Sequence, residues 1–466
     1  KKIIDILKEL NPKNDYEKSV PPMRYTPSKR AILAASFLLP ALVMTAVFAV
    51  CGLAPFGTRT IGVMDMAHQY LPFLYSLHDV LAGRTDLLYL PSMCLGGNML
   101  GVAAYYLTSP LNLICCLFPR ESMYTAISLT YFLRVGLCGL TMCLYTGKRH
   151  GWGLRCLIPA MAYAFTAYMV GYCFNYLWQD CVILLPVIAL GIVRLVQTRR
   201  PWLYVISLAA ALLLNFYIGY ILCIFSVLFF LYEFFSVPRA ERAAPWRTVG
   251  TFALSSLAAG ALAAALLLPT AFSLSGGKAE FSLSVLTFTP QFDPVAMLSK
   301  LYPGAFRYEE IMPSGLPQIF TGTVTTALAV LYFLNGRRHL LIAVGISAAV
   351  TALVFIGRTY DYTTWAAGLG AVLVIAAVCA ILWAMARPNV RKGLVCALAA
   401  ALLLIHAGDL AVNAKLSLDS LTVPAANSAS YAEYVIAKAE AFDPIDTGGT
   451  FTRVESTTEF NQDRCE

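Results

Sequence analysis

Apolar runs of about 20 residues recur along most of this chain, and they constrain its fold more than any other feature. A helix of about 20 apolar residues is long enough to cross the hydrocarbon core of a bilayer, which is about 30 Å thick. Hydrophobic residues make up 59% of the 466 residues and charged residues only 13%, against about 25% charged residues in a soluble domain. The sequence therefore predicts an all-α polytopic membrane protein.

The apolar runs are continuous and lack the period-two alternation that marks the strands of a membrane β-barrel. One of them is short for a span, which indicates a tilt, a break or close pairing with the next run. We predict eleven spans, at residues 31–54, 122–146, 154–174, 179–196, 202–215 (the short one), 217–235, 248–270, 318–334, 339–357, 365–386 and 393–411.

Basic residues indicate how these spans are oriented. With the N-terminus in the cytoplasm, the predicted inner segments carry 22 Lys and Arg against 6 Asp and Glu, and the outer segments carry 11 against 20. Lys and Arg concentrate on the cytoplasmic side of membrane proteins. We therefore expect a multi-pass protein of the plasma membrane whose N-terminus is cytoplasmic. Because the basic residues are spread over loops that orient helices, we do not expect nucleic acid as a partner.

Composition divides the chain into three parts. Residues 1–30 form a basic cytoplasmic tail, which either contacts anionic lipid or is a solvated segment that orients the first span. Residues 31–411 form the transmembrane domain, with long outer loops at 55–121 and 271–317. Residues 412–466 begin an extracytoplasmic domain of mixed helix and strand that is too short for a core, so we expect the protein to continue.

The first outer loop contains two unusual apolar segments. Residues 66–82 place their large apolar side chains at helical spacing, which predicts a helix lying in the membrane interface. Residues 98–118 are apolar but are interrupted by Pro110 and are rich in Gly, Tyr and Asn. Irregular backbone at membrane depth must face protein or a water-filled cavity. We therefore expect a re-entrant or juxtamembrane element over 98–118.

Asp65 stands just outside the first span, immediately before the predicted interfacial helix. A carboxylate in this place can take a proton from a hydroxyl group while remaining close to a lipid headgroup. The alternative is that Asp65 is the N-cap of the helix that begins near Met66. The sequence leaves both roles open, and one residue can fill both.

Polar groups within or beside the spans are further candidates for substrate binding. Arg134 lies inside the second span, where a charge is costly unless it has a partner or a cavity. We expect Arg134 to face the inside of the bundle, as a phosphate or carboxylate contact or in a structural ion pair. Gln179 and Asp180, at the outer end of the fourth span, either line a substrate site or cap the helix.

Aromatic residues and Asn215 mark the outer ends of other spans. Asn215 and Tyr217, with Tyr220, either satisfy a broken helix or face a lipid ligand. Tyr105 and Tyr106 either stack on a substrate or belong to the aromatic belt at the interface.

Three outer cations lie close to spans: Lys278, Arg307 and Arg358. Each either contacts lipid headgroups or stabilises negative charge that develops on a substrate. His68 and His78 have no third ligand at a useful spacing, so no zinc site is expected. A divalent cation held by Asp65 and a substrate phosphate stays open. Most of the 13 cysteines lie in apolar runs, where Cys behaves as a small hydrophobic residue, so no disulfide framework is expected.

Several short motifs occur in order over residues 30–335, and together they resemble the YfhO family of bacterial membrane proteins. The motifs are Asp65-x-x-x-Gln69-Tyr70-x-x-Phe73, Leu95-Gly96-Gly97-Asn98, Tyr105-Tyr106-x-x-Ser109-Pro110-Leu111-Asn112, Gln179-Asp180, Leu184-Leu185-Pro186, Asn215-Phe216-Tyr217-Ile218-Gly219-Tyr220, Leu301-Tyr302-Pro303-Gly304 and Leu316-Pro317-Gln318-Ile319-Phe320-x-Gly322. The chain departs from the family after residue 356, where only a short outer segment remains before the next span.

The resemblance implies a GT-C-like bundle and a glycosyltransferase that moves a sugar from a polyprenyl-phosphate carrier to an envelope acceptor at the outer face. It implies a teichoic-acid-like polymer as acceptor and an acidic catalytic base in the first outer loop, a position that Asp65 matches. Through their motifs it adds Gln69, Tyr70 and Asn98 to the substrate-binding candidates. The alternatives are a lipid-linked glycan transporter or flippase, and an envelope-assembly scaffold. One deep cation and no clear internal repeat favour the enzyme over a transporter.

Overall fold

The computed structural model describes residues 27–86, 88–90, 97–237, 245–275, 297–306, 316–333, 345, 362–385, 387 and 390–421. Within these residues seven helices are long and apolar enough to cross a membrane. They are α3 (Lys29–Cys51), α7 (Met123–His150), α10 (Tyr176–Thr198), α12 (Phe216–Ser236), α13 (Pro245–Ser275), α17 (Tyr362–Met385) and α18 (Lys392–Leu421). The prediction of an all-α polytopic membrane protein is confirmed.

Shorter apolar helices account for three more of the predicted spans. These are α11 (Trp202–Leu214), α15 (Thr323–Phe333) and α8 (Leu157–Ala164), which follows the short turn η3 (Leu154–Cys156). The predicted single span 154–174 is wrong in one respect, because its second half is a separate helix, α9 (Ala167–Gly171). The side chain of Thr166 accepts a hydrogen bond from the Met169 amide, and this N-cap starts a new helix.

Other predicted boundaries shift or fall outside the described residues. Helix α18 continues to Leu421, past the predicted end of the last span at residue 411, so the outer segment starts later than expected. The predicted span 339–357 lies outside the described residues apart from Gly345. Most of the predicted tail 1–30 and the part of 412–466 that follows Leu421 lie outside them too.

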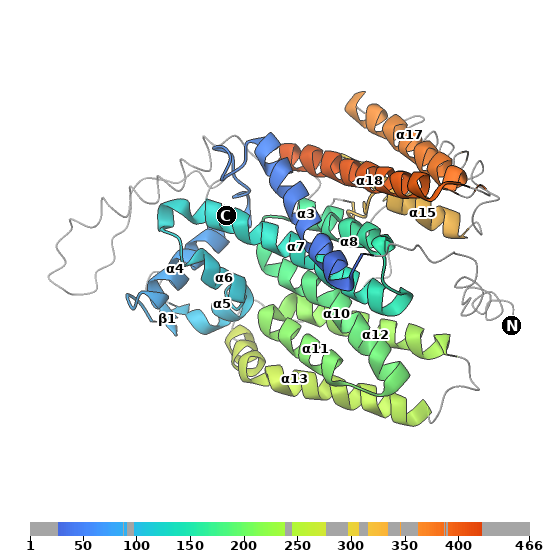
Figure 1. Cartoon of the computed structure of the whole chain (residues 1–466). Helices are drawn as coiled ribbons and strands as arrows, with labels where there is room; N and C mark the ends of the chain where they lie inside the picture. Colours follow the sequence, from blue (N-terminus) through green and yellow to red (C-terminus); the bar gives the residue numbers. More distant parts are fainter. Residues whose placement is uncertain are drawn as a thin grey trace.

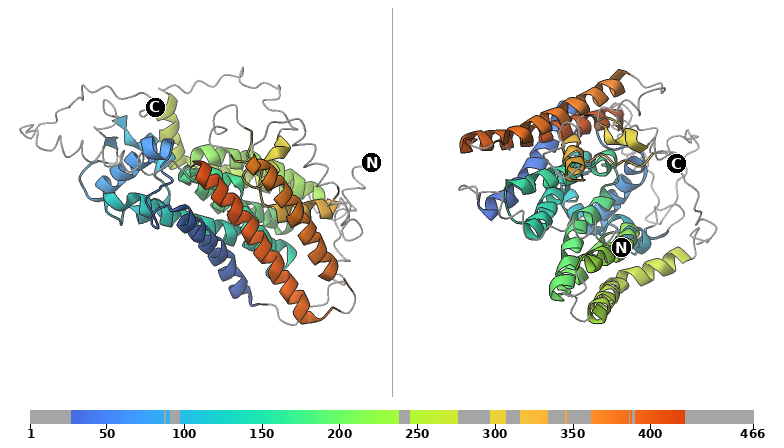
Figure 2. Two further views of the ribbon diagram at one scale, coloured as in Figure 1. Left: turned by 90° about the horizontal axis from the view of Figure 1, so that it is seen from above. Right: turned by 90° about the vertical axis from the view of Figure 1, so that its right-hand side faces the viewer.

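The helices form three groups that lie side by side (Figures 1 and 2). Helices α3, α7, α8 and α10 form the centre of the bundle. Helices α11, α12 and α13 pack on one flank, against α10. Helices α15, α17 and α18 lie on the other flank. Helix α18 packs on α3, α8 and α9, and α15 also contacts α8.

Glycines allow the closest approaches between these helices. A side chain at Gly139 of α7 would place its first carbon 2.3 Å from the backbone oxygen of Ser36 in α3. A side chain at Gly191 of α10 would approach the backbone nitrogen of Tyr204 in α11 to 2.6 Å. Small residues let membrane helices pack backbone against backbone. These two contacts therefore hold α3 tightly against α7 and α11 tightly against α10.

The first outer loop folds into short elements at one end of the bundle, which we call the outer end (Figure 1). They are η1 (Met66–Tyr70), α4 (Leu71–Leu81), β1 (Tyr89–Leu90), β2 (Gly97–Asn98), α5 (Met99–Tyr106), α6 (Pro110–Cys115) and η2 (Arg120–Ser122). The predicted helix over 66–82 is present as the π-helical η1 followed by α4, which buries Leu71, Leu74 and Leu77. The segment 98–118 is broken, as expected, into α5 and α6.

A row of buried polar residues on α18 ties the outer segments together. The carboxylate of Asp409 accepts hydrogen bonds from the amide (2.6 Å) and hydroxyl (2.7 Å) of Thr323, at the start of α15. The side-chain oxygen of Asn413 accepts from the Gly304 amide at 2.9 Å. Nearer the outer end, Arg59 of the first loop forms an ion pair with Asp419 at 3.0 Å. Helix α18 thus joins parts of both predicted outer loops.

The charge pattern and these contacts predict opposite accessibility for the two ends of the bundle. Ala82, after α4, and Gln197, near the end of α10, are both exposed. In intact cells, an impermeant maleimide should label Ala82→Cys directly and Gln197→Cys only after permeabilisation. The protein without an added cysteine gives the background. Direct labelling of Gln197→Cys together with protection of Ala82→Cys would invert the predicted orientation.

Candidate active site

Asp65 lies at the outer end of the bundle, between the turn that leaves α3 and the start of η1. The preceding residue, Met64, has φ of 49°, in the left-handed region that few residues other than glycine adopt. The chain therefore turns sharply immediately before Asp65. Backbone of this kind often occurs where a fold must place a functional group.

The side chain of Asp65 does not cap the helix that follows it. Asp65 stands at the N-cap position of η1, but its carboxylate accepts no capping hydrogen bond. Its Oδ2 lies 3.4 Å from the hydroxyl of Tyr70, while that hydroxyl donates a shorter hydrogen bond, 2.6 Å long, to Oδ1 of Asn175. No lysine or arginine within the described residues forms an ion pair with Asp65. The half-buried carboxylate therefore lies near a protein hydroxyl and can still accept a hydrogen bond from a further donor.

Tyrosine rings form one wall of the site beside Asp65. Tyr70 packs on Tyr106 (ring centroids 5.4 Å apart), which packs on Tyr105 (4.6 Å), which packs on Phe216 at the start of α12 (5.4 Å). The hydroxyl of Tyr106 donates to Oε1 of Gln69 at 2.8 Å. Four predicted site residues, Gln69, Tyr70, Tyr105 and Tyr106, are thus brought together with Asp65.

The tyrosine hydroxyls of this wall stay protonated at neutral pH. Burial raises the pKa of Tyr106 to about 12, and the neighbouring Tyr105 and Asp65 add to the shift. Burial, and then the charge of Asp65, raise the pKa of Tyr70 still further above its ordinary value. The two side chains therefore serve as hydrogen-bond donors to groups at the site rather than as bases.

Asn215 joins α5 to the α11–α12 junction. Its Oδ1 accepts from the Ile218 amide (2.9 Å) and so caps α12, while its Nδ2 donates to the backbone oxygen of Tyr105 (3.0 Å). Asn215 therefore satisfies the break between α11 and α12, which is one of the two roles expected from the sequence. Tyr217 remains 49% exposed and lies 6.4 Å from the Tyr105 ring and 6.1 Å from the Trp178 ring.

Arg134 and Asp180 meet behind the tyrosine wall as a buried ion pair. Nε of Arg134 donates to Oδ1 of Asp180 at 3.2 Å, and neither side chain is more than 6% exposed. Nη2 of Arg134 also donates to Oγ of Ser109 (3.3 Å), and the guanidinium lies 5.1 Å from the centre of the Tyr176 ring. Arg134 faces the inside of the bundle, as expected, and its partner is the aspartate of α10.

The remaining predicted site residues lie apart from Asp65 or outside the described side chains. Gln179 is buried in the bundle and donates to the backbone oxygen of Cys173 at 3.4 Å. Asn98 belongs to β2 and pairs with Tyr89, but its side chain lies outside the described part. Lys278, Arg307 and Arg358 lie outside the described residues. In the described part of the chain, no three His, Cys, Asp or Glu residues come together as a metal site would need.

Sequence reasoning missed Asn175, Tyr176 and Trp178, which all contact predicted site residues. Asn175 binds Tyr70, Tyr176 packs edge-on against the Tyr70 ring at 5.9 Å, and Trp178 donates to the Tyr105 hydroxyl at 3.2 Å. The sequence signal that could have identified them was the run of polar and aromatic residues from Asn175 to Asp180, at the start of α10.

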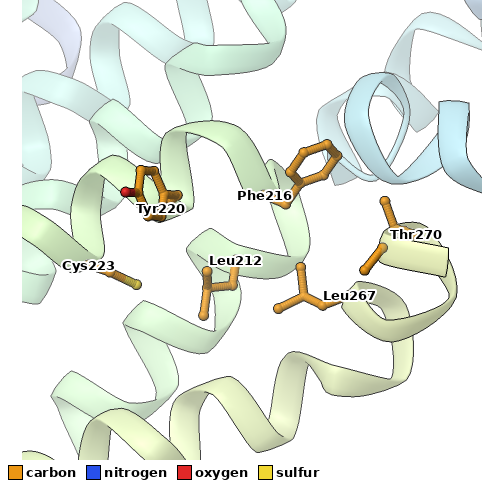
Figure 3. Close-up of a pocket in the computed structure, with 7 residues that line it drawn as sticks. Leu212, Phe216, Tyr220, Cys223, Leu267 and Thr270 are labelled. Carbon is orange, nitrogen blue, oxygen red and sulfur yellow. The ribbon is translucent and has the colours of Figure 1, made fainter. Parts of the chain in front are cut away.

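An apolar cavity of about 320 Å³ opens between α11, α12 and α13 near the outer end (Figure 3). It is lined by Leu212, Phe216, Tyr220, Cys223, Leu267, Thr270 and Ala271. Phe216 belongs both to this lining and to the row of rings that leads to Tyr70. Tyr220 is 65% exposed and Phe272, next to the lining, is 77% exposed, so this flank carries apolar surface suited to a bilayer.

Comparisons with known proteins give one match. A family model described as "Bacterial membrane protein YfhO" matches residues 35–340, which include Asp65, the re-entrant segment, Arg134, Asp180 and Asn215. No curated protein and no solved structure matches the chain.

Proposed function

The chain belongs to the YfhO family of bacterial membrane proteins, and on that basis we propose that it is a GT-C-like glycosyltransferase of the plasma membrane. Its donor is a sugar on a polyprenyl phosphate, and its acceptor is a hydroxyl of a teichoic-acid-like envelope polymer at the outer face. The observation that carries the proposal is Asp65, whose half-buried carboxylate at the outer end makes no capping bond and no ion pair with any described residue.

In the proposed reaction Asp65 accepts the proton of the acceptor hydroxyl. The acceptor oxygen forms a bond to the anomeric carbon of the sugar, and the bond between that carbon and the phosphate oxygen breaks. The polyprenyl phosphate leaves with the bonding electrons. The hydroxyls of Tyr70 and Tyr106 donate their own protons to Asn175 and Gln69, so their oxygens are available to accept hydrogen bonds from sugar hydroxyls. Tyr105 and Tyr217 offer ring faces for stacking. The outer-loop cations Lys278, Arg307 and Arg358 are the proposed contacts for the phosphate charge.

The main alternative, transport of a lipid-linked glycan, finds less support. A transporter would carry unpaired ionisable groups deep in several spans, near the midplane. Among the described residues, the ionisable groups of this kind have structural partners. Arg134 pairs with Asp180, and Asp409 caps α15. The enzyme proposal therefore stands ahead of the transporter.

Cells that lack the protein provide a test of the proposed function. Their envelope polymer should lose its sugar substituent, measured by mass spectrometry of isolated polymer, while the polyprenyl-phosphate sugar accumulates. Restoring the wild-type gene should restore the substituent. An unchanged polymer in the deletion strain would contradict the proposal.

The cavity beside Phe216 suits the isoprenoid chain of the donor, because it is apolar, faces the lipid flank and adjoins the aromatic wall. We expect Leu267→Trp to fill it. Displacing about two methylene groups, each worth about 0.8 kcal/mol of burial, predicts roughly a tenfold rise in KM for a long-chain donor. The KM for a short-chain donor should not change.

Leu257→Trp is the matched control for this experiment. Leu257 lies on the same helix, is 70% exposed and does not line the cavity. Equal KM values for the long-chain donor in the two variants would show that the cavity does not bind the donor.

A further inference from the structure

Arg134 of α7 contacts two other elements beside the candidate active site. Its guanidinium is fully buried at 0% exposure, and it reaches α10 through Asp180 and the ring of Tyr176, and the start of α6 through Ser109. A guanidinium has a planar fork of donors, so one side chain can hold two partners in fixed directions while its face stacks on a ring. A lysine ammonium has no such fork.

Two of these contacts, those with Ser109 and Tyr176, continue toward the candidate base. Ser109 accepts from the Leu111 amide (3.2 Å) and so caps α6, and Asn112 of that helix donates to the backbone oxygen of Tyr106 (3.2 Å). Tyr176 packs edge-on against Tyr70, whose hydroxyl lies between Asn175 and Asp65. Tyr70 and the α5–α6 segment thus both rest on groups that Arg134 contacts.

We propose that Arg134 is a positioning residue, which sets Tyr70 and the α5–α6 segment around Asp65, and that it does not bind the donor phosphate. This inference rests on the proposed function, because it takes Asp65 to be the catalytic base. It replaces the interpretation of Arg134 as a phosphate contact, because the charge is enclosed and already paired with Asp180. A cation that positions protein groups affects the rate of reaction, whereas a phosphate ligand affects donor affinity.

Kinetics of Arg134→Lys separate the two roles, because this variant keeps the charge but loses the fork. We expect kcat to fall roughly 100-fold, the scale of a misplacement of about 1 Å, with KM for the polyprenyl-phosphate sugar within about twofold of the wild type. Arg194→Lys is the matched control, since Arg194 is exposed on α10. An Arg134→Lys enzyme with normal kcat and raised KM would overturn the proposal.

Tyr176→Leu tests the same role without touching any charge. It removes the ring between Arg134 and Tyr70, so positioning predicts a lower kcat with KM unchanged. An unchanged kcat in this variant would contradict the connection through Tyr176.

A readout that does not depend on activity keeps this inference separate from the proposed function. Amide hydrogen exchange over residues 99–115 should become roughly tenfold faster in Arg134→Lys, because α5 and α6 lose an anchor. Unchanged exchange would overturn the positioning role even if the wild-type protein transfers sugar. Faster exchange in a protein that transfers no sugar would support the anchor and contradict the enzyme proposal alone.

Discussion

Asp65→Asn is expected to reduce sugar transfer by roughly 10²–10⁴-fold, the usual contribution of a general base. Asn has nearly the size of Asp but does not accept a proton at neutral pH. The structure gives little reason for the variant to misfold, because the Asp65 carboxylate makes no capping bond. The hydroxyl of Tyr70, 3.4 Å away, can donate to an amide oxygen in the same place. The loss should therefore be one of chemistry.

The effect is measured in a deletion strain that expresses each variant at wild-type level, as the sugar content of isolated envelope polymer. Asp86→Asn is the matched control, since Asp86 is an exposed carboxylate of the same loop whose Oδ1 accepts a hydrogen bond from the nearby Leu88 amide. It should keep full activity. Normal polymer in cells with well-expressed Asp65→Asn would remove Asp65 from the reaction.

Breaking the buried ion pair should produce the largest loss of stability. Asp180→Leu leaves the charge of Arg134 buried without its partner, which costs about 3–5 kcal/mol of unfolding free energy. Arg134→Met leaves Asp180 in the same position and should cost a similar amount. The double variant Arg134→Met/Asp180→Leu replaces the pair with apolar side chains and should recover most of the loss.

Unfolding of the purified protein in detergent measures this cycle. Arg84→Met is the control, because Arg84 pairs with Asp79 at 3.3 Å on the surface and should contribute less than about 1 kcal/mol. The double variant should be stable yet slow in transfer, since it also loses the contacts to Ser109 and Tyr176. A double variant whose losses simply add would show that the two charges do not stabilise each other.

The spans were predictable because length and apolar character decide which segments cross a membrane. The break at Thr166 was not, since a cap within an apolar run leaves the average hydropathy high and depends on one side-chain contact to Met169. The extension of α18 was missed for a related reason. By hydropathy the polar residues after position 411, among them Asn413, mark the start of a loop, but the side-chain oxygen of Asn413 accepts a hydrogen bond from the Gly304 amide of a distant segment.

Several residues of the candidate site could be predicted from the sequence, but the contacts between them could not. Position and resemblance identify Asp65, Tyr70 and Tyr106, and the cost of a charge in a span identifies Arg134. The partner of Arg134 could not be predicted, because Asp180 is 46 positions away and only the packing of α7 against α10 brings the two together. Asn175 was missed because its role depends on the Tyr70 hydroxyl, which only the fold brings within hydrogen-bond distance of its side chain.

Transfer by the purified protein in liposomes tests the central claim most directly. The liposomes contain a radiolabelled polyprenyl-phosphate sugar, envelope polymer is added outside, and label in the polymer is counted over time. We predict that the wild-type protein moves label into the polymer and releases polyprenyl phosphate in equal amount, and that Asp65→Asn stays at the level of empty liposomes. Label that crosses the bilayer without entering the polymer, or equal transfer by the two proteins, would contradict the account.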